Sequence, residues 1–120
     1  MSSPFGAILR ETVEATPGAV AGVFAANDGE PVDVFPAASE RWSLIAAHYG
    51  VVLANVQAAL HTLHYGEAAS LIIRNDQGTM LLETVSEGYY AMLGLAPRGH
   101  LATASRALAR AARRLREEMA

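Results

Sequence analysis

The spacing of apolar residues changes along this chain and divides it into eight segments. Phe5, Ile8, Leu9 and Val13 recur at helical spacing after Ser3-Pro4, a typical helix start, and Thr16-Pro17-Gly18 would end that helix. Two short apolar runs follow at 19–26 and 30–35, joined by Asn27-Asp28-Gly29. Because Asn and Gly tolerate the positive φ of tight turns, these runs predict a β-hairpin.

The stretch from Ser39 to Tyr65 predicts a long central helix, since it contains no proline and only one glycine, Gly50. Its inner stripe at a 3.6-residue period consists of Trp42, Ile45, Ala46, Tyr49, Val52, Leu53, Val56, Leu60 and Leu63. We expect this stripe to pack on a sheet and Gly66 to end the helix as a left-handed cap.

Three strand-like segments at 67–74, 79–86 and 88–96 come next, separated by the turn sequences Asn75-Asp76-Gln77-Gly78 and Ser86-Glu87-Gly88. They predict a meander of three strands. Apolar residues occur at both the odd and the even positions of these segments, so we expect both faces of the sheet to be covered. A last helix follows, with an apolar stripe of Leu101, Ala104, Leu108, Ala111, Leu115 and Met119. The predicted order is α-β-β-α-β-β-β-α in one α/β (α+β) domain over residues 1–120.

The outer side of the central helix should be polar and is not. It carries Leu44, Ala47, Val51, Ala54, Ala58, Thr62 and Tyr65. A helix that is apolar all round is normally covered all round, and a chain of this length has few elements left to cover it. We therefore predict a partner-binding surface made of Arg41, Leu44, Ala47, His48, Val51, Asn55, Ala58 and Thr62. The alternative is an alanine-rich face that is simply weakly solvated.

Composition narrows the class of protein. The 120 residues are 52% hydrophobic, which suits one domain, and the lack of cysteine excludes disulfides and thiolate zinc sites. A net charge of −3 does not favour nucleic acid or an anionic membrane as a partner. We find no signal peptide and no apolar run of membrane-span length, so we expect a cytoplasmic protein without membrane insertion. Five of the nine arginines fall in the last helix, where they usually form a solvated face.

The chain lacks the motifs of common enzyme classes. It has no lysine, no G-x-S-x-G sequence and neither of the glycine-rich nucleotide-binding motifs. His61, His64 and Glu67 have a spacing compatible with metal ligands, but no further ligand accompanies them and a packing or capping role is the better interpretation. Asp28 and Asp76 fall in turns, where such side chains have local structural roles. We expect no enzyme activity, no metal and no cofactor.

Several stretches together resemble the Roadblock/LC7 family, which includes dynein light chains and MglB-like regulators of small GTPases. They are 17–24 (PGAVAGVF) leading into 27–29, the uninterrupted central helix, and 70–74 (SLIIR) before a hairpin into 89–93 (YYAML). The resemblance implies a three-layer αβα sandwich of profilin-like fold, with a five-stranded antiparallel sheet between the central helix and the other two helices.

The resemblance also implies a homodimer and a protein partner. Family dimers join the edge strand that follows the central helix, which is Ala68, Ala69, Ser70, Leu71, Ile72, Ile73 and Arg74 in this chain. The paired central helices would then receive a Ras-like GTPase. Our leading hypothesis is a GTPase regulator or co-activator, with Arg41 the first candidate for an arginine supplied in trans. The alternatives are a structural adaptor without effect on GTP turnover and a profilin-like or longin-like ligand sensor.

Overall fold

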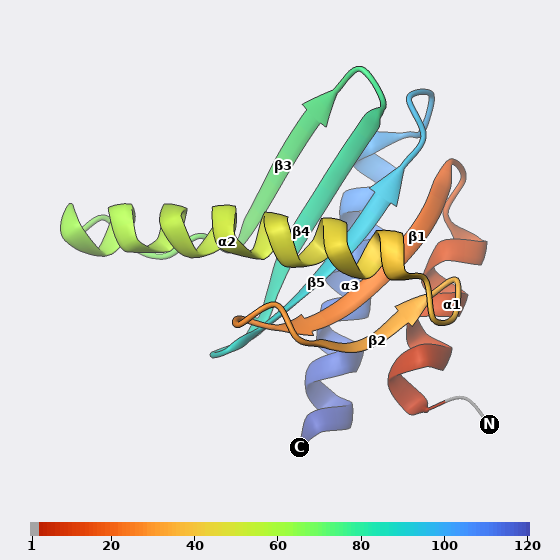
Figure 1. The fold of residues 1–120 in the computed structure, drawn as a ribbon, viewed down its shortest axis with the longest axis horizontal. Coiled ribbons are helices and arrows are strands. Elements are labelled where there is room, and N and C mark those ends of the chain that lie inside the picture. The colour runs from red at the N-terminus through yellow and green to blue at the C-terminus, as the bar shows by residue number, and fades with distance from the viewer. Residues whose placement is uncertain (1–2) are drawn as a thin grey trace.

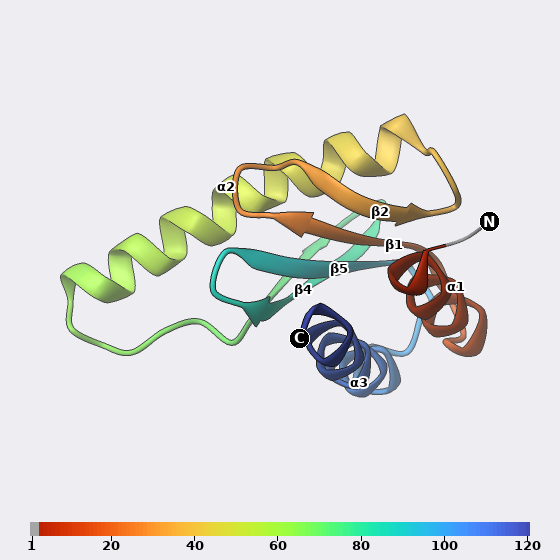
Figure 2. The same ribbon diagram turned by 90° about the horizontal axis from the view of Figure 1, so that it is seen from below.

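The computed structural model describes residues 3–120, which form three layers (Figures 1 and 2). The middle layer is a five-stranded antiparallel sheet in the order β2-β1-β5-β4-β3. Its strands are β1 (Ala19–Ala26), β2 (Pro31–Phe35), β3 (Ser70–Asn75), β4 (Gly78–Ser86) and β5 (Tyr89–Leu95). Helices α1 (Pro4–Ala15) and α3 (Leu101–Met119) cover one face, and α2 (Glu40–Thr62) crosses the other. The predicted element order and three-layer arrangement are confirmed.

The start of α1 is fixed by Ser3. Its hydroxyl oxygen accepts a hydrogen bond from the Gly6 amide at 3.0 Å, and its hydroxyl also donates to the Asp33 carboxylate of β2. Pro4 then occupies the first helical position, where its missing N–H costs nothing. The predicted helix start is confirmed, and the Asp33 contact ties it to the sheet.

Two hydrophobic cores lie on the two faces of the sheet. Phe24, Leu81 and Leu93 face α1 and α3, whereas Val23, Leu82 and Met92 face α2. Consecutive residues of the central strands are therefore buried on opposite faces, as predicted. The prediction of two covered faces is wrong for β3, where Ile72 is 47% exposed.

The end of α2 differs from the sequence prediction. The helix ends at Thr62, and His64, with φ of 52°, takes the capping position that we expected at Gly66. Gly66 is also left-handed, with φ of 80°, but it lies two residues further on. The His64 amide donates to the His61 carbonyl at 3.1 Å and the Tyr65 amide donates to the Leu60 carbonyl at 2.9 Å. This pair of bonds is a Schellman motif, which satisfies carbonyls at a helix end and here makes Gly66 unnecessary as a cap.

Candidate protein-binding surface

Two aromatic side chains hold α2 on the sheet. The buried Tyr90 hydroxyl donates a hydrogen bond to the Ala46 carbonyl at 2.8 Å, and a Cβ atom at Gly50 would lie 2.7 Å from Tyr90 Cζ. On the same face, Trp42 lies over Gly94, where an added Cβ would be 2.7 Å from Trp42 Cη2. Burial, with a smaller contribution from Asp28, raises the pKa of Tyr90. These close contacts fix which side of α2 faces away from the sheet.

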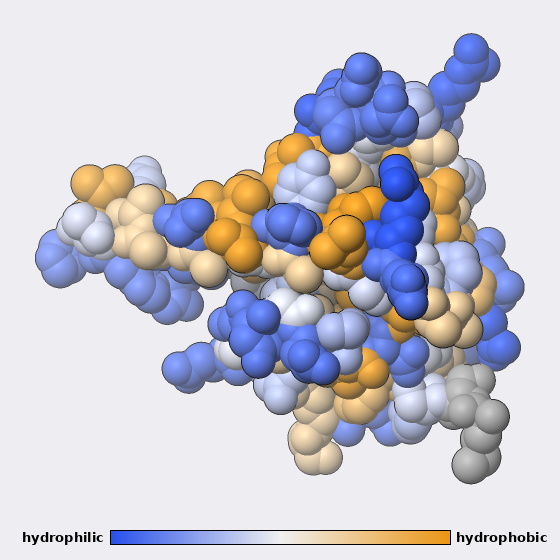
Figure 3. All heavy atoms as spheres, in the orientation of Figure 1, coloured by the Kyte–Doolittle hydropathy of each residue, from blue (hydrophilic) through white to orange (hydrophobic). Residues whose placement is uncertain are grey.

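The outward side of α2 is the surface that the sequence predicted. Leu44 is 61% exposed and Val51 is 59% exposed. The other exposed members of the α2 outer face are Arg41, His48, Asn55, Ala58 and Thr62. Ala47 is half-buried, because it packs against Gly29 in the turn between β1 and β2. Figure 3 shows hydrophobic residues gathered along this helix on the face toward the viewer.

The inner stripe of α2 is only partly buried, contrary to the prediction. Ala46 and Leu53 are buried, but Val52 is 39% exposed and Leu63 is 70% exposed. For Leu63 the reason is that the C-terminal part of α2 extends past the sheet on the β3 side, so that no strand within residues 3–120 lies beneath it (Figures 1 and 2). We call this part, residues 56–62, the α2 overhang.

The composition of α2 differs from a second expectation, that the chain has no apolar stretch of membrane-span length. Its most apolar 18-residue window has a mean hydropathy of 1.4, so the helix is long and apolar enough to cross a membrane by length and composition. Only 17% of that window is buried within the chain. Here α2 instead docks on the sheet through Trp42, Ala46 and Leu53, which leaves a large apolar surface without a covering element.

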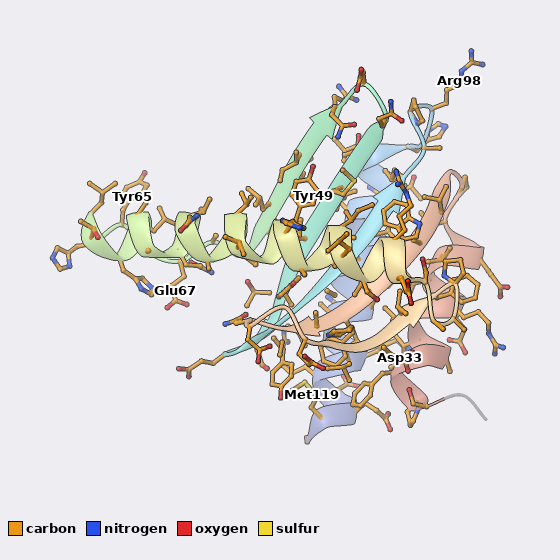
Figure 4. All side chains as sticks on the ribbon, viewed as in Figure 1. Asp33, Tyr49, Tyr65, Glu67, Arg98 and Met119 are labelled. Atoms are coloured by element: carbon orange, nitrogen blue, oxygen red, sulfur yellow. The ribbon has the colours of Figure 1, made fainter. Side chains whose placement is uncertain are left out.

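Side chains from α2 fasten the segment that leads back to β3. The Gln57 amide accepts from the Ala68 N–H at 2.8 Å and donates to the Ala68 carbonyl at 3.0 Å. His61 Nε2 lies 3.3 Å from Glu67 Oε1. Figure 4 shows Tyr65 and Glu67 at the projecting end of the helix. Gln57 thus occupies both backbone polar groups of Ala68, and β3 begins at Ser70 rather than at the predicted Glu67.

A cleft of about 480 Å³ lies between α2 and the turn from β4 to β5. Its lining includes Leu53, Gln57, His61, Glu67 and Glu87. Within residues 3–120 no three His, Asp or Glu side chains are grouped so that they could hold a metal ion. Asp28 accepts from the Glu30 amide at 3.0 Å, as its turn predicted, whereas Asn75 rather than Asp76 makes the equivalent bonds in the later turn.

The predicted dimer residues lie at an open edge of the sheet. Strand β3 pairs with β4 alone, so the outer row of its backbone polar groups has no partner strand within residues 3–120. Ser70, Leu71, Ile72, Ile73 and Arg74 belong to this strand, while Ala68 and Ala69 precede it. The Ala69 carbonyl still accepts from the Thr84 amide of β4, at 3.0 Å.

The burial of Glu83, on the sheet face opposite α2, can be tested through the pH dependence of stability. Burial raises the pKa of Glu83, and the nearby Arg116 opposes that rise. An acid whose pKa is raised on folding destabilises the fold where it is ionised, and that penalty disappears as the pH falls and the carboxyl is protonated. We expect Glu83→Gln to raise the melting temperature at pH 7 and to match the parent chain near pH 4. A gain that grows as the pH falls would contradict this assignment.

The sequence itself matches no family model and no curated protein, whereas the fold matches solved structures. A Roadblock/LC7 domain from Streptomyces avermitilis aligns with a TM-score of 0.88 at 14% identity, over 95% of this chain and 96% of the other. The gliding protein MglB from Thermus thermophilus aligns with a TM-score of 0.83 at 16% identity, over 100% of this chain and 95% of the other. LokiProfilin2, solved in complex with rabbit actin, aligns at 0.59 and 16% identity over 98% of each chain.

Proposed function

We propose that this chain, which has the Roadblock/LC7 fold, is a non-catalytic homodimeric module of the cytoplasm that docks a Ras-like small GTPase on the α2 outer face and regulates it. The observation that carries the proposal is the exposure of Leu44 and Val51 on the outward side of α2. An apolar surface of this kind on a soluble domain is typical of a protein contact. The choice of a GTPase as partner rests on the family resemblance in the sequence.

The two edges of the sheet support self-association through β3. Edge strand β2 has only five residues and contains Pro31, with Pro36 directly after it. Proline donates no backbone hydrogen bond, so β2 is a poor template for another strand. Strand β3 contains no proline, and the α2 overhang extends on its side of the molecule (Figure 1). A second copy paired along β3 would lie beneath that overhang and cover its apolar residues.

Ile72→Lys tests the strand pairing. Ile72 is 47% exposed, so we expect the monomer to fold normally, with unchanged circular dichroism. In a two-fold pair of β3 strands, two added charges would lie close together, and like charges across a strand pair destabilise it. Light scattering should therefore give the mass of one chain instead of two. Val32→Lys, a change at similar exposure (43%) on β2, is the matched control and should leave the dimer intact.

The proposed function is tested by light scattering with a Ras-like GTPase. The dimer alone is compared with the dimer plus GTPase loaded with a non-hydrolysable triphosphate, and then with the diphosphate form. If a larger species forms with the triphosphate-loaded GTPase but not with the diphosphate form, the chain is a regulator, because its binding depends on the nucleotide state of the GTPase. Failure to bind either form contradicts the proposed function. Binding with an unchanged rate of GTP hydrolysis assigns the chain to the second class, a structural adaptor.

Arg41→Ala tests whether this chain supplies a reacting group. Arg41 lies exposed in the first turn of α2, where a bound GTPase could reach it. If it acts as an arginine finger, GTP hydrolysis in the complex should slow by about 1000-fold while the affinity is retained. Retained stimulation of hydrolysis would reject that role and leave the positioning of the partner's own catalytic groups as the mechanism.

A further inference from the structure

The side chain of Gln57 takes the place of a neighbouring strand at Ala68. Its Oε1 accepts from the Ala68 N–H at 2.8 Å, and its Nε2 donates to the Ala68 carbonyl at 3.0 Å. A glutamine amide carries an acceptor and donors side by side, as the backbone of another strand does. The Thr84 hydroxyl also donates to the Ala68 carbonyl, at 3.2 Å. Both backbone polar groups of Ala68 are therefore in use, and a second strand cannot bond to them while Gln57 holds them.

After Ala68, the outer edge of β3 offers only a short run of backbone groups. The Ala69 carbonyl faces β4, because it accepts from the Thr84 amide at 3.0 Å. Along an antiparallel pair, residues that bond to the neighbouring strand alternate with residues that do not. The β3 residues whose N–H and C=O groups point to the outer edge are therefore Ser70, Ile72 and Arg74. The run ends there, because Asn75 pairs with Gly78 across the turn to β4.

Three outward-facing residues allow one fully bonded register for two antiparallel copies of β3. Ile72 would lie opposite Ile72 of the partner subunit, and Ser70 opposite Arg74 of the partner subunit. All the outward backbone groups are then bonded, and we call this the Ile72-centred register. A shift of two residues in one direction would place Arg74 opposite the partner's Ala68, which Gln57 already holds. A shift in the other direction would place Ser70 opposite the turn, where it has no strand to bond.

The side chains also fit the Ile72-centred register. Ile72 is 47% exposed and lies on the sheet face opposite α2, since its neighbour Leu71 packs toward α2. The Ile72 side chains of the two copies would cover each other across the two-fold axis. A register centred on Arg74 would instead bring two arginines face to face, and like charges directly opposite each other destabilise a strand pair.

We propose that Gln57 sets the register of the dimer by removing Ala68 from the strand edge, so that the two-fold axis passes through Ile72. The inference rests on the proposed pairing along β3 and adds the residue that selects among the possible registers. Gln57 is a positioning residue, because it acts through Ala68 of its own chain. Since Tyr90 and Trp42 hold each α2 on its own sheet, the register also fixes how the two α2 outer faces are placed for a common partner.

The test uses single cysteines, because the chain contains none of its own. Each variant is oxidised with copper phenanthroline, and the initial rate of cross-linking is measured on non-reducing gels. Ile72→Cys should cross-link to its own copy, since the Cα atoms of a directly bonded pair lie about 5.5 Å apart, within the range of a disulfide. Ser70→Cys and Arg74→Cys should not cross-link alone, whereas a mixture of these two variants should. One member of each mixture carries a short tag, so that mixed cross-links have their own size.

Gln57→Ala, added to Ile72→Cys, tests the role of the glutamine. With Ala68 released, the shifted register gains bonds to Arg74 of the partner subunit, so cross-linking at Ile72→Cys should slow about fivefold, the effect of one net hydrogen bond on an equilibrium. Mixed cross-links between Ser70→Cys and Ile72→Cys should increase in the same background. The matched control is Asn55→Ala, which removes an exposed amide from the same helix and should change the rate less than about twofold.

Two results would overturn the register but leave the β3 dimer in place. The first is cross-linking of Ser70→Cys alone, of Arg74→Cys alone, or between Ile72→Cys and either of them, in chains that retain Gln57. The second is unchanged cross-linking of Ile72→Cys after Gln57→Ala.

The failure of the dimer itself gives a different result. If no variant cross-links although light scattering gives the mass of two chains, the copies meet through another surface, and both the register and the β3 pairing are wrong. The mass of one chain would contradict the homodimer. Circular dichroism of each variant confirms that the fold is intact.

Discussion

Val51→Glu is expected to weaken binding of a Ras-like GTPase by about 30-fold or more, the effect of losing a central interface residue. Val51 is 59% exposed in the free chain and lies midway along the α2 outer face, between Leu44 and Ala58. In the proposed complex the new carboxylate would be buried without a partner, which costs far more than the lost apolar contact. Isothermal titration with the triphosphate-bound GTPase measures the change.

The matched control for this variant is Val20→Glu, since Val20 is 42% exposed and lies on β1 rather than on α2. It adds the same charge to the molecule and should leave the affinity within about twofold, the usual range for a surface change outside an interface. Wild-type affinity for Val51→Glu would remove Val51 from the docking surface. Light scattering before the titration shows whether the variant is still a dimer. A monomer would assign Val51 to the contact between copies instead.

Gly50→Val is expected to lower the free energy of unfolding by about 3 kcal/mol, the upper end of the usual cost of overpacking. The first added carbon would lie 2.7 Å from Cζ of Tyr90, a side chain that is 1% exposed and has no room to move aside. The helix itself favours the change, because valine is a better helix former than glycine. A loss of stability therefore reports the contact with Tyr90. Urea denaturation followed by circular dichroism measures it.

Ala54→Val is the control for this prediction, because Ala54 is exposed on the same helix. It should cost less than about 1 kcal/mol, the difference in helix propensity between the two residues. Adding Tyr90→Leu to Gly50→Val should cost less than the sum of the two single changes, since both alter one contact. Strict additivity would show that Gly50 and Tyr90 do not constrain each other.

The sequence predicted the elements of this fold because their signals are local. Ser3 and Pro4 begin a helix, Asn27 to Gly29 form a turn, and the double apolar pattern of β4 and β5 reflects burial on two faces. The exposed outer side of α2 was also predictable, since Leu44 and Val51 are out of phase with the inner stripe. Each of these conclusions depends on residues that are neighbours along the chain.

The extent of burial along α2 could not be read from its periodicity. Leu63 has the phase of a buried residue, yet it is 70% exposed because the sheet ends before the helix does. Val52 is 39% exposed because it lies at the border of the inner stripe. The length of α2 does indicate that part of the helix extends beyond the sheet. At 1.5 Å per residue the 23 residues of α2 span about 35 Å, whereas five strands spaced about 4.8 Å apart place the two edge strands only about 19 Å from each other.

Contacts between distant residues were the other features that the sequence did not predict. Gln57 binds the backbone of Ala68, and Gly50 accommodates Tyr90 from a strand far along the chain. Neither glutamine nor glycine in a helix has a pattern that names its partner. The cap at His64 was missed for a related reason. Glycine is the usual residue for a left-handed cap, and Gly66 does have a positive φ, but the two hydrogen bonds that end the helix place the cap at His64.

The difference between the two sheet edges also limits the size of any assembly. In the proposed dimer, one two-fold contact consumes the β3 edges of both copies. The ten-stranded sheet that results ends on both sides at β2, where Pro31 lies within the strand and Pro36 follows it. Each end is a poor template for a further strand. In the proposed dimer, growth by strand addition would therefore stop at two copies, and the exposed β3 edge would be protected from polymerising into fibres.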